Sequence, residues 1–174
     1  DHLVPNATAQ GWQFDADNTP WYFALRENEE TTDYCAGSIS MYNPAGQSDN
    51  WMVTNQLYLP NAFCFLSFDV QSYLNRKEDH LKVYVYADDA VYTTLNAEIV
   101  QNIRTYGTCI YHEKENCGTS EENLSGEWTQ RRISLEAFAG KNIYIAFVNE
   151  DNDQSAVFVD NIRVIYKSNC LLGL

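Results

Sequence analysis

The carboxylate with the most informative setting is Asp160, which lies within the apolar stretch SAVFVDNIRVIY at 155–166. Side chains alternate between the two faces of a strand, so even-numbered residues share one face and odd-numbered residues share the other. The odd face carries Asn161 and Arg163, which makes it the more polar of the two. The pattern therefore predicts that the even face, and Asp160 with it, points into the core.

A carboxylate inside a core needs a partner, because burying an unpaired charge is costly. Ca²⁺ fits this need, since it binds about six to eight oxygen ligands, and Asp15 and Asp17 would add further oxygens. The alternative is that Asp160 caps a backbone turn or pairs with a distant Lys or Arg, and both interpretations are open. The segment after Asp15 lacks the glycine and the distal glutamate of an EF-hand loop, which excludes that motif.

The chain contains five cysteines, namely Cys35, Cys64, Cys109, Cys117 and Cys170. Cys109 and Cys117 flank the polar segment IYHEKEN, and a disulfide that closes this predicted loop would stabilise the protein by roughly 2–3 kcal/mol. A bond between Cys35 and Cys64 is a second possibility. No Cys-x-x-Cys pair occurs and the three histidines are scattered, so the sequence does not predict a zinc site.

The sequence shows no motif that indicates catalysis. Gly-x-Ser-x-Gly is absent, and His80 stands among charged residues at the start of a predicted strand, without a recognisable nucleophile beside it. A glycosidase needs two facing carboxylates, and no Asp or Glu here lies in a recognisable catalytic motif. We therefore predict a protein that is not an enzyme.

Aromatic side chains are a better lead to function, since they make up 14% of the chain. Large aromatics often fill the core of a sandwich, and we interpret Trp51 and Trp128, at predicted strand ends, in that way. Tyr106 and Tyr111 lie in a long polar insertion at 106–127. We expect both rings to be exposed and to stack on a sugar or anchor a protein partner.

The charge of the chain excludes some classes of partner. The sequence carries 24 Asp and Glu against 11 Lys and Arg, a formal net charge of −13. Such a chain repels phosphate backbones and anionic membrane surfaces, so we expect no nucleic-acid partner. No run of about 18 apolar residues occurs, so no transmembrane helix and no membrane insertion is predicted, and the first ten residues lack the features of a signal peptide.

Alternating apolar residues and turn signals predict an all-β fold. The expected strands are two short ones within 11–25, then 37–43, 51–59, 63–70, 80–87, 128–135, 142–149 and 155–166. The segment TTLNAEIVQNI is interpreted as a short helix or an irregular excursion. About eight or nine strands without strand–helix alternation are typical of a two-sheet antiparallel jelly-roll sandwich. We expect a linker at 1–10, one jelly-roll domain at 11–168 and a tail at 169–174.

Several short motifs follow one another in a characteristic order. The more specific ones are DNWMVT at 49–54 and FVDNI at 158–162, and GW at 11–12, LSFDV at 66–70 and LKVYV at 81–85 accompany them. Together they resemble the cleaved-adhesin and choice-of-anchor J domains of Bacteroidota surface proteins, which are related to gingipain adhesin modules and MAM-like jelly rolls. The motifs cover the chain from residue 11 to about residue 166.

The resemblance implies a jelly-roll domain with bound Ca²⁺ in a supporting role. The acidic residues that match the ligand positions of the family are Asp15 or Asp17, Glu78 or Asp79, and Asp160, with Asp49 ranked lower. The first turn lacks the Gly-rich continuation common in the family, and the insertion at 106–127 has no clear counterpart there.

The resemblance also implies a function and a location. We expect an adhesin-like module that recognises a glycan or a host protein and that is secreted or displayed on the outer cell surface as one module of a larger protein. The alternative is a carbohydrate-binding accessory domain, or a spacer, of a larger secreted enzyme.

Overall fold

Segments rich in Val, Ile, Phe and Tyr form the strands of the computed structural model, because these side chains fit a pleated, half-buried surface. The structure describes residues 21–26, 33–41, 45–60, 63–72, 79–92, 94–112 and 127–166. The predicted linker at 1–10 and tail at 169–174 lie outside the described residues. In chain order the elements are β1 (Tyr22–Arg26), β2 (Asp33–Ile39), β3 (Asn50–Val53), β4 (Leu57–Tyr58), β5 (Cys64–Ser72), β6 (Leu81–Ala87), α1 (Ala97–Tyr106), β7 (Thr108–His112), β8 (Thr129–Ser134), the 3₁₀ helix η2 (Glu136–Phe138), β9 (Asn142–Asn149) and β10 (Ala156–Tyr166).

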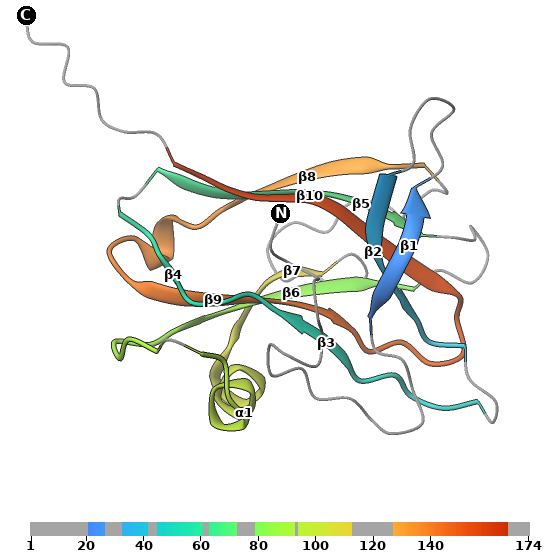
Figure 1. Ribbon diagram of the computed structural model, residues 1–174, viewed down its shortest axis with the longest axis horizontal. Helices are drawn as coiled ribbons and strands as arrows, with labels where there is room; N and C mark the ends of the chain where they lie inside the picture. The colour runs from blue at the N-terminus through green and yellow to red at the C-terminus, as the bar shows by residue number, and fades with distance from the viewer. Residues whose placement is uncertain are drawn as a thin grey trace, which may run out of the picture.

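Two antiparallel sheets pack face to face as a sandwich (Figure 1), which confirms the predicted fold class. The first, which we call the β5 sheet, has the strand order β1-β2-β10-β5-β8. The second, which we call the β9 sheet, has the order β3-β9-β6-β7, and β4 also pairs with β9. Each sheet therefore has an inner face toward its partner and an outer face away from it.

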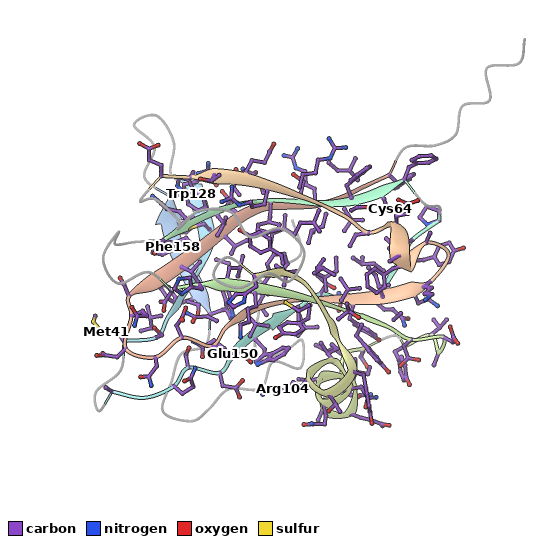
Figure 2. The ribbon with its side chains drawn as sticks, turned by 180° about the vertical axis from the view of Figure 1, so that it is seen from behind. Met41, Cys64, Arg104, Trp128, Glu150 and Phe158 are labelled. Atoms are coloured by element: carbon purple, nitrogen blue, oxygen red, sulfur yellow. The ribbon has the colours of Figure 1, made fainter. Side chains whose placement is uncertain are left out.

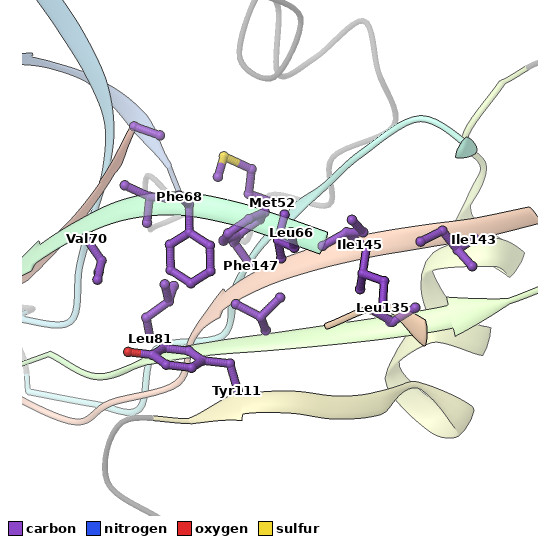
Figure 3. Packing of buried hydrophobic residues seen from close by; sticks show 14 of the residues in the cluster. Met52, Leu66, Phe68, Val70, Leu81, Tyr111, Leu135, Ile143, Ile145 and Phe147 are labelled. Atoms are coloured by element: carbon purple, nitrogen blue, oxygen red, sulfur yellow. The ribbon is translucent and has the colours of Figure 1, made fainter. Parts of the chain in front are cut away.

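The core lies between the two sheets and is built from alternate residues of their central strands. In β5 the even-numbered residues from 64 to 70 are all fully buried, as their apolar alternation predicts. Phe68 meets the ring of Phe147 from β9 edge-on at 5.4 Å between centroids, and the ring of Tyr111 from β7 at 5.5 Å (Figure 3). These aromatic contacts join the β5 sheet to the β9 sheet.

A second apolar cluster lies on the outer side of the β9 sheet, where α1 covers it (Figure 1). Ile99 and Ile103 of α1 pack there with residues that include Trp51 and Tyr144. The Asn96 side chain caps the helix by accepting a hydrogen bond from the backbone N–H of Ile99 at 2.9 Å. The segment TTLNAEIVQNI thus contains a helix, and no helix among the described residues is long and apolar enough to cross a membrane.

Two stretches differ from the strand pattern expected from the sequence. The expected insertion at 106–127 contains β7, which pairs with β6 at the edge of the β9 sheet. The expected strand at 51–59 is divided into β3 and β4, both paired with β9. Elements of two to five residues are too short for their alternation to be recognised, and pairing with longer neighbours determines them instead.

A β-bulge interrupts β10. Asp160 pairs with Asp69 of β5, but the next paired residue of β10 is Arg163, opposite Ser67. Two residues of β10 therefore oppose a single residue of β5. Asn161 in the bulge has a positive φ of 50°, a conformation that Asn tolerates better than most residues.

The bulge reverses which face of β10 is buried. Val157 and Val159 belong to the core before the bulge, whereas Ile162 and Val164 pack against it afterwards. Asp160 precedes the reversal and therefore lies on the outer face of the β5 sheet. The prediction that Asp160 points into the core is wrong, because it assumed unbroken alternation along the whole strand.

The conformation of Asn161 can be tested by two substitutions that both remove its hydrogen bond to Asp69. We expect Asn161→Val to be less stable than Asn161→Gly by about 1–2 kcal/mol, because a β-branched residue is strained at positive φ and glycine is not. Urea unfolding of the two variants measures the difference. Equal midpoints and slopes would contradict the bulge geometry.

Candidate functional site

Asp79, just before β6, is a fully buried carboxylate. Its Oδ1 accepts a hydrogen bond from the hydroxyl of Ser40, which follows β2 in the opposite sheet. Its Oδ2 is also buried and has no hydrogen-bond partner in the described part of the chain. A buried carboxylate oxygen without a donor is unfavourable, so a cation at this position would stabilise the protein.

The surroundings of Asp79 disfavour its negative charge. Burial, together with the neighbouring charge of Asp151, raises the pKa of Asp79 from 3.8 to about 6, although the polar groups of Ser40 and Asn149 act in the opposite direction. The site therefore favours the protonated carboxyl or a carboxylate neutralised by a bound cation.

Asp151, the second carboxylate of this region, follows β9 and is held by His80. The backbone N–H of His80 donates to Asp151 Oδ2, and His80 Nδ1 lies 3.1 Å from the same oxygen. The hydroxyl of Ser48 donates to the backbone oxygen of Asp151 at 2.8 Å. Two carboxylates thus meet at the end of the sandwich where β6 begins and β9 ends.

Neutral polar side chains line the same end of the sandwich and satisfy one another. Asn50 Nδ2 donates to the Ser38 hydroxyl at 2.9 Å, and Asn149 Nδ2 donates to the same oxygen at 3.3 Å. The indole N–H of Trp21 donates to the backbone oxygen of Asn50 at 3.2 Å. These bonds connect β2 of the β5 sheet to β3 and β9 of the other sheet. The polar side chains that make them lie near Asp79.

Calcium suits Asp79 in its chemistry, but the described residues supply only part of a site. Ca²⁺ takes about six to eight oxygen ligands, of which Asp79 Oδ2 would be one. Within the described ranges, no three His, Cys, Asp or Glu side chains are grouped so that they could hold a metal ion. Asp15, Asp17 and Glu78 lie outside the described residues, so their role as ligands stays a prediction.

Asp160 has a counterion of its own. The guanidinium of Arg26 donates to Asp160 Oδ2, and its Nη1 lies 3.5 Å from Asp69 Oδ2. Asp160 and Asp69 are directly opposite each other in the sheet, where like charges repel, and Arg26 neutralises that repulsion. Arg26 Cζ also lies 4.4 Å from the ring centroid of Trp128. The pairing of Asp160 with a distant arginine, which the sequence left open, is thus present, and a calcium role for Asp160 stays an untested prediction.

Asp49, the lower-ranked calcium candidate, is also engaged by other side chains. Arg104 of α1 donates to both of its carboxylate oxygens, at 2.9 and 2.7 Å, and Trp51 Nε1 donates to Oδ1 at 2.6 Å. The same guanidinium lies 4.7 Å from the Trp51 ring centroid. Figure 2 shows Arg104 beside α1, far from Trp128 and Phe158 on the β5 sheet. Asp49 therefore holds the helix on the β9 sheet.

The two tyrosines expected to be exposed differ in their surroundings. Tyr106 ends α1 and is 70% exposed, as expected. Tyr111 is 1% exposed, and its hydroxyl accepts a hydrogen bond from Arg131 Nε at 2.9 Å. The expectation for Tyr111 is wrong, because β7 joins the β9 sheet and turns this ring into the core.

The cysteines are partly as predicted. Cys109 is disulfide-bonded. Cys117 lies outside the described residues, so its pairing with Cys109 stays a prediction. Cys35 and Cys64 both remain thiols, which contradicts the second predicted bond. They lie near opposite ends of the β5 sheet. Cys35 is next to Ala36, and Ala36 is aligned, through β10, with Val70 of β5. Val70 lies about 20 Å along β5 from Cys64, too far for a disulfide.

The functional residues that the sequence analysis missed come from distant segments. Ser40 is 39 residues from Asp79, and Arg26 is 134 residues from Asp160. No local pattern encodes such pairs. Asn149 is the exception, because a polar residue that ends the apolar run NIYIAFVN was a readable signal for a buried hydrogen bond.

Known structures resemble this fold over most of the chain. The K3 cleaved adhesin domain of Lys-gingipain (Kgp) from Porphyromonas gingivalis W83 matches with a TM-score of 0.52 and 19% identity, over 86% of this chain and 92% of that one. The K2 cleaved adhesin domain of Lys-gingipain matches with a TM-score of 0.55 and 16% identity, over 92% of this chain and 86% of that one. At these identities the similarity to cleaved adhesin domains is established for the fold.

Two further comparisons give a weaker or a partial similarity. TmCBM61 in complex with β-1,4-galactotriose has a TM-score of 0.49 and 12% identity, over 87% of this chain and 91% of that one. A family model described as the expansin-like protein C-terminal domain matches residues 90–167, somewhat less than half of the chain. No curated protein matches the chain.

The raised pKa of Asp79 predicts how stability depends on pH in calcium-free buffer. Well below pH 3.8 this carboxyl is protonated in the folded and the unfolded chain and has no effect. As pH rises from 4 to 6 the unfolded chain ionises first, so stability falls, and above about pH 6 the loss is constant. We expect Asp79→Asn to remove this loss and to be more stable than the wild type by about 1–3 kcal/mol at pH 7–8.

Urea unfolding of both proteins in EDTA at pH 3.5, 5 and 7.5 measures this difference. The advantage of the variant should nearly disappear at pH 3.5, where Asp79 is mostly protonated in both states. A constant difference across the three pH values would contradict the raised pKa.

Proposed function

We propose that this chain is a non-catalytic binding module of an exported protein that recognises a glycan or a host protein. Support comes from the fold, which cleaved adhesin domains share over most of the chain. The disulfide at Cys109 supports export, because such bonds persist in oxidising compartments. The net charge of −13 opposes a nucleic-acid partner.

A second candidate is a carbohydrate-binding accessory domain, or a spacer, of a larger secreted enzyme. The match of residues 90–167 to the expansin-like protein C-terminal domain favours this candidate, because that family is by its description one domain of a larger protein. In both cases the chain would act as one module of a secreted or outer-surface protein, and its own contribution would be binding.

We further propose that Ca²⁺ binds at Asp79 and supports the structure. The buried Oδ2 of Asp79, which lacks a hydrogen-bond donor in the described part of the chain, is the observation in favour. Asp15 and Asp17 are proposed as further ligands. Asp160 is left out of the proposed ligand set because Arg26 already neutralises it. When bound, the ion would supply the positive charge that neutralises Asp79.

The calcium proposal predicts a rise in melting temperature when CaCl₂ replaces EDTA. A ligand present at one hundred times its Kd stabilises by about 2.7 kcal/mol, which corresponds to roughly 5–10 °C for a domain of this size. Asp79→Asn should abolish the rise, although the same variant is expected to be the more stable protein in EDTA.

Asp160→Asn is the matched control, since this carboxylate already has Arg26 as its partner and the calcium-dependent rise should persist. MgCl₂ at the same concentration controls for ionic strength. No rise in the wild type at millimolar Ca²⁺, or an equal rise in Asp79→Asn, would overturn the proposed site.

The binding role predicts a ligand for the isolated chain. A glycan array and a pull-down with host extracellular proteins should give at least one saturable interaction, whereas assays for hydrolysis of the same glycans should show no turnover. A spacer would bind in neither experiment, and measurable hydrolysis would refute the non-catalytic assignment.

A further inference from the structure

Tyrosines gather on the outer side of the β9 sheet beside the end of α1. Tyr86 of β6 and Tyr144 of β9 are directly paired across the two strands, so their side chains share one face of the sheet. Both belong to the apolar cluster that α1 covers. Tyr106 is the last residue of that helix, and Tyr92 lies in the segment between β6 and α1. The four rings come from four different segments of the chain.

Two of these tyrosines, Tyr86 and Tyr144, are acted on by the charge of Asp88. The pKa of Tyr86 is raised by burial and then by Asp88, Tyr92 and Tyr106. Burial, followed by Asp88, Tyr92 and Tyr86, raises the pKa of Tyr144 to about 12. Tyr86 and Tyr144 therefore stay protonated at neutral pH and remain hydrogen-bond donors.

Asp88 is oriented by the backbone, and one of its oxygens has spare capacity. Its own N–H donates to the backbone oxygen of Asn142 at 3.0 Å, and the N–H of Ala90 donates to its Oδ1 at 3.0 Å. The nearest phenol, that of Tyr86, is 3.4 Å from Oδ2. This distance exceeds that of an ordinary O–H···O bond, so Oδ2 is available to a closer donor.

Gln56 holds the segment that carries Tyr92. Its Nε2 donates to the backbone oxygen of Ala90 at 2.7 Å, and its Oε1 accepts from the backbone N–H of Tyr92 at 3.0 Å. Tyr92 is 36% exposed, and the Tyr106 ring is mostly exposed. Tyr92 and Tyr106 both act electrostatically on Tyr86, so two accessible rings lie in the region of a carboxylate that the backbone already orients. Such preorganisation reduces the entropy lost on binding.

The hydroxyl of Tyr144 is a separate observation in favour of a polar ligand at this place. The residue is buried, and its hydroxyl has no hydrogen-bond partner in the described part of the chain. A buried hydroxyl without a partner is unfavourable, and a ligand hydroxyl or a water molecule that reached it would satisfy it.

We propose that the surface formed by Tyr86, Asp88, Tyr92, Tyr106 and Tyr144, which we call the tyrosine surface, binds a neutral sugar. The inference rests on the proposed binding function and assigns its glycan to one site. Exposed tyrosine rings stack on the apolar faces of pyranoses, a carboxylate accepts hydrogen bonds from sugar hydroxyls, and phenols exchange hydrogen bonds with them. Asp88 and the net charge of −13 oppose sulfated or uronic-acid sugars.

Affinity electrophoresis of the full chain tests the site with neutral polysaccharides, namely galactan, mannan and xylan, and with the anionic polysaccharides polygalacturonate and heparin. We expect retardation by at least one neutral polysaccharide. Tyr92→Ala, Tyr106→Ala and Asp88→Asn should each weaken that affinity about ten-fold or more, as loss of a central contact does. Tyr166→Ala is the matched control, because this tyrosine is 60% exposed at the end of β10 in the other sheet and should leave the affinity unchanged.

Tyr144→Phe separates a binding role from a structural one. Removal of an unpartnered buried hydroxyl should leave the melting temperature unchanged or higher, and the affinity for the same polysaccharide should fall several-fold. A merely structural hydroxyl would leave the affinity as in the wild type.

The possible outcomes distinguish this inference from the function it rests on. If a neutral polysaccharide binds and the tyrosine-surface variants keep wild-type affinity, the glycan site lies elsewhere and the inference is wrong while the binding function stands. Binding to the anionic polysaccharides alone overturns the neutral-sugar assignment. If the wild type binds no polysaccharide, both the inference and the glycan form of the proposed function are overturned, and a protein partner remains.

Discussion

Phe68 packs edge-on against Phe147 and Tyr111, and the arrangement of both sheets depends on keeping the surface around this contact apolar. The bulge in β10 follows from that requirement. At the bulge, two residues of β10 stand opposite Phe68. The reversal of the buried face that results keeps Val159 inward before the bulge and Ile162 inward after it. A strand of this length without a bulge would turn one half of its apolar residues toward water.

Charged groups are displaced to the outer faces and the ends of the sandwich as a result. On the outer face of the β5 sheet, Asp160 and Asp69 stand side by side, and Arg26 makes their proximity tolerable. On the outer side of the β9 sheet, Arg104 forms an ion pair with Asp49. Asp79 is different, because it is fully buried between strands of both sheets and no cation among the described side chains pairs with it. Among the carboxylates of the described ranges, Asp79 therefore combines full burial with an oxygen that lacks a partner.

The helix has two structural effects on the outer side of the β9 sheet. By covering Trp51 and Tyr144, α1 completes an apolar cluster outside the main core, and its last turn brings Tyr106 near Tyr86 of β6. Because of where the helix ends, one side of the cluster is buried and the other side is exposed. The stable part of this cluster thus supports accessible rings, an arrangement that suits binding without a large rearrangement.

The sequence by itself determined the two-sheet sandwich, the buried face of β5 and the exposure of Tyr106. Alternation and polarity are local properties of the sequence, and they indicate directly which side chains are buried. Only the tertiary structure decided that Asp160 faces outward toward Arg26 and that Tyr111 faces inward. A single extra residue in a strand reverses every side chain after it, and a short strand acquires its face from the sheet it joins. Whether a carboxylate such as Asp79 has a hydrogen-bond donor depends on groups that the fold brings together from distant parts of the chain. The spacing of residues along the sequence does not show which groups these are.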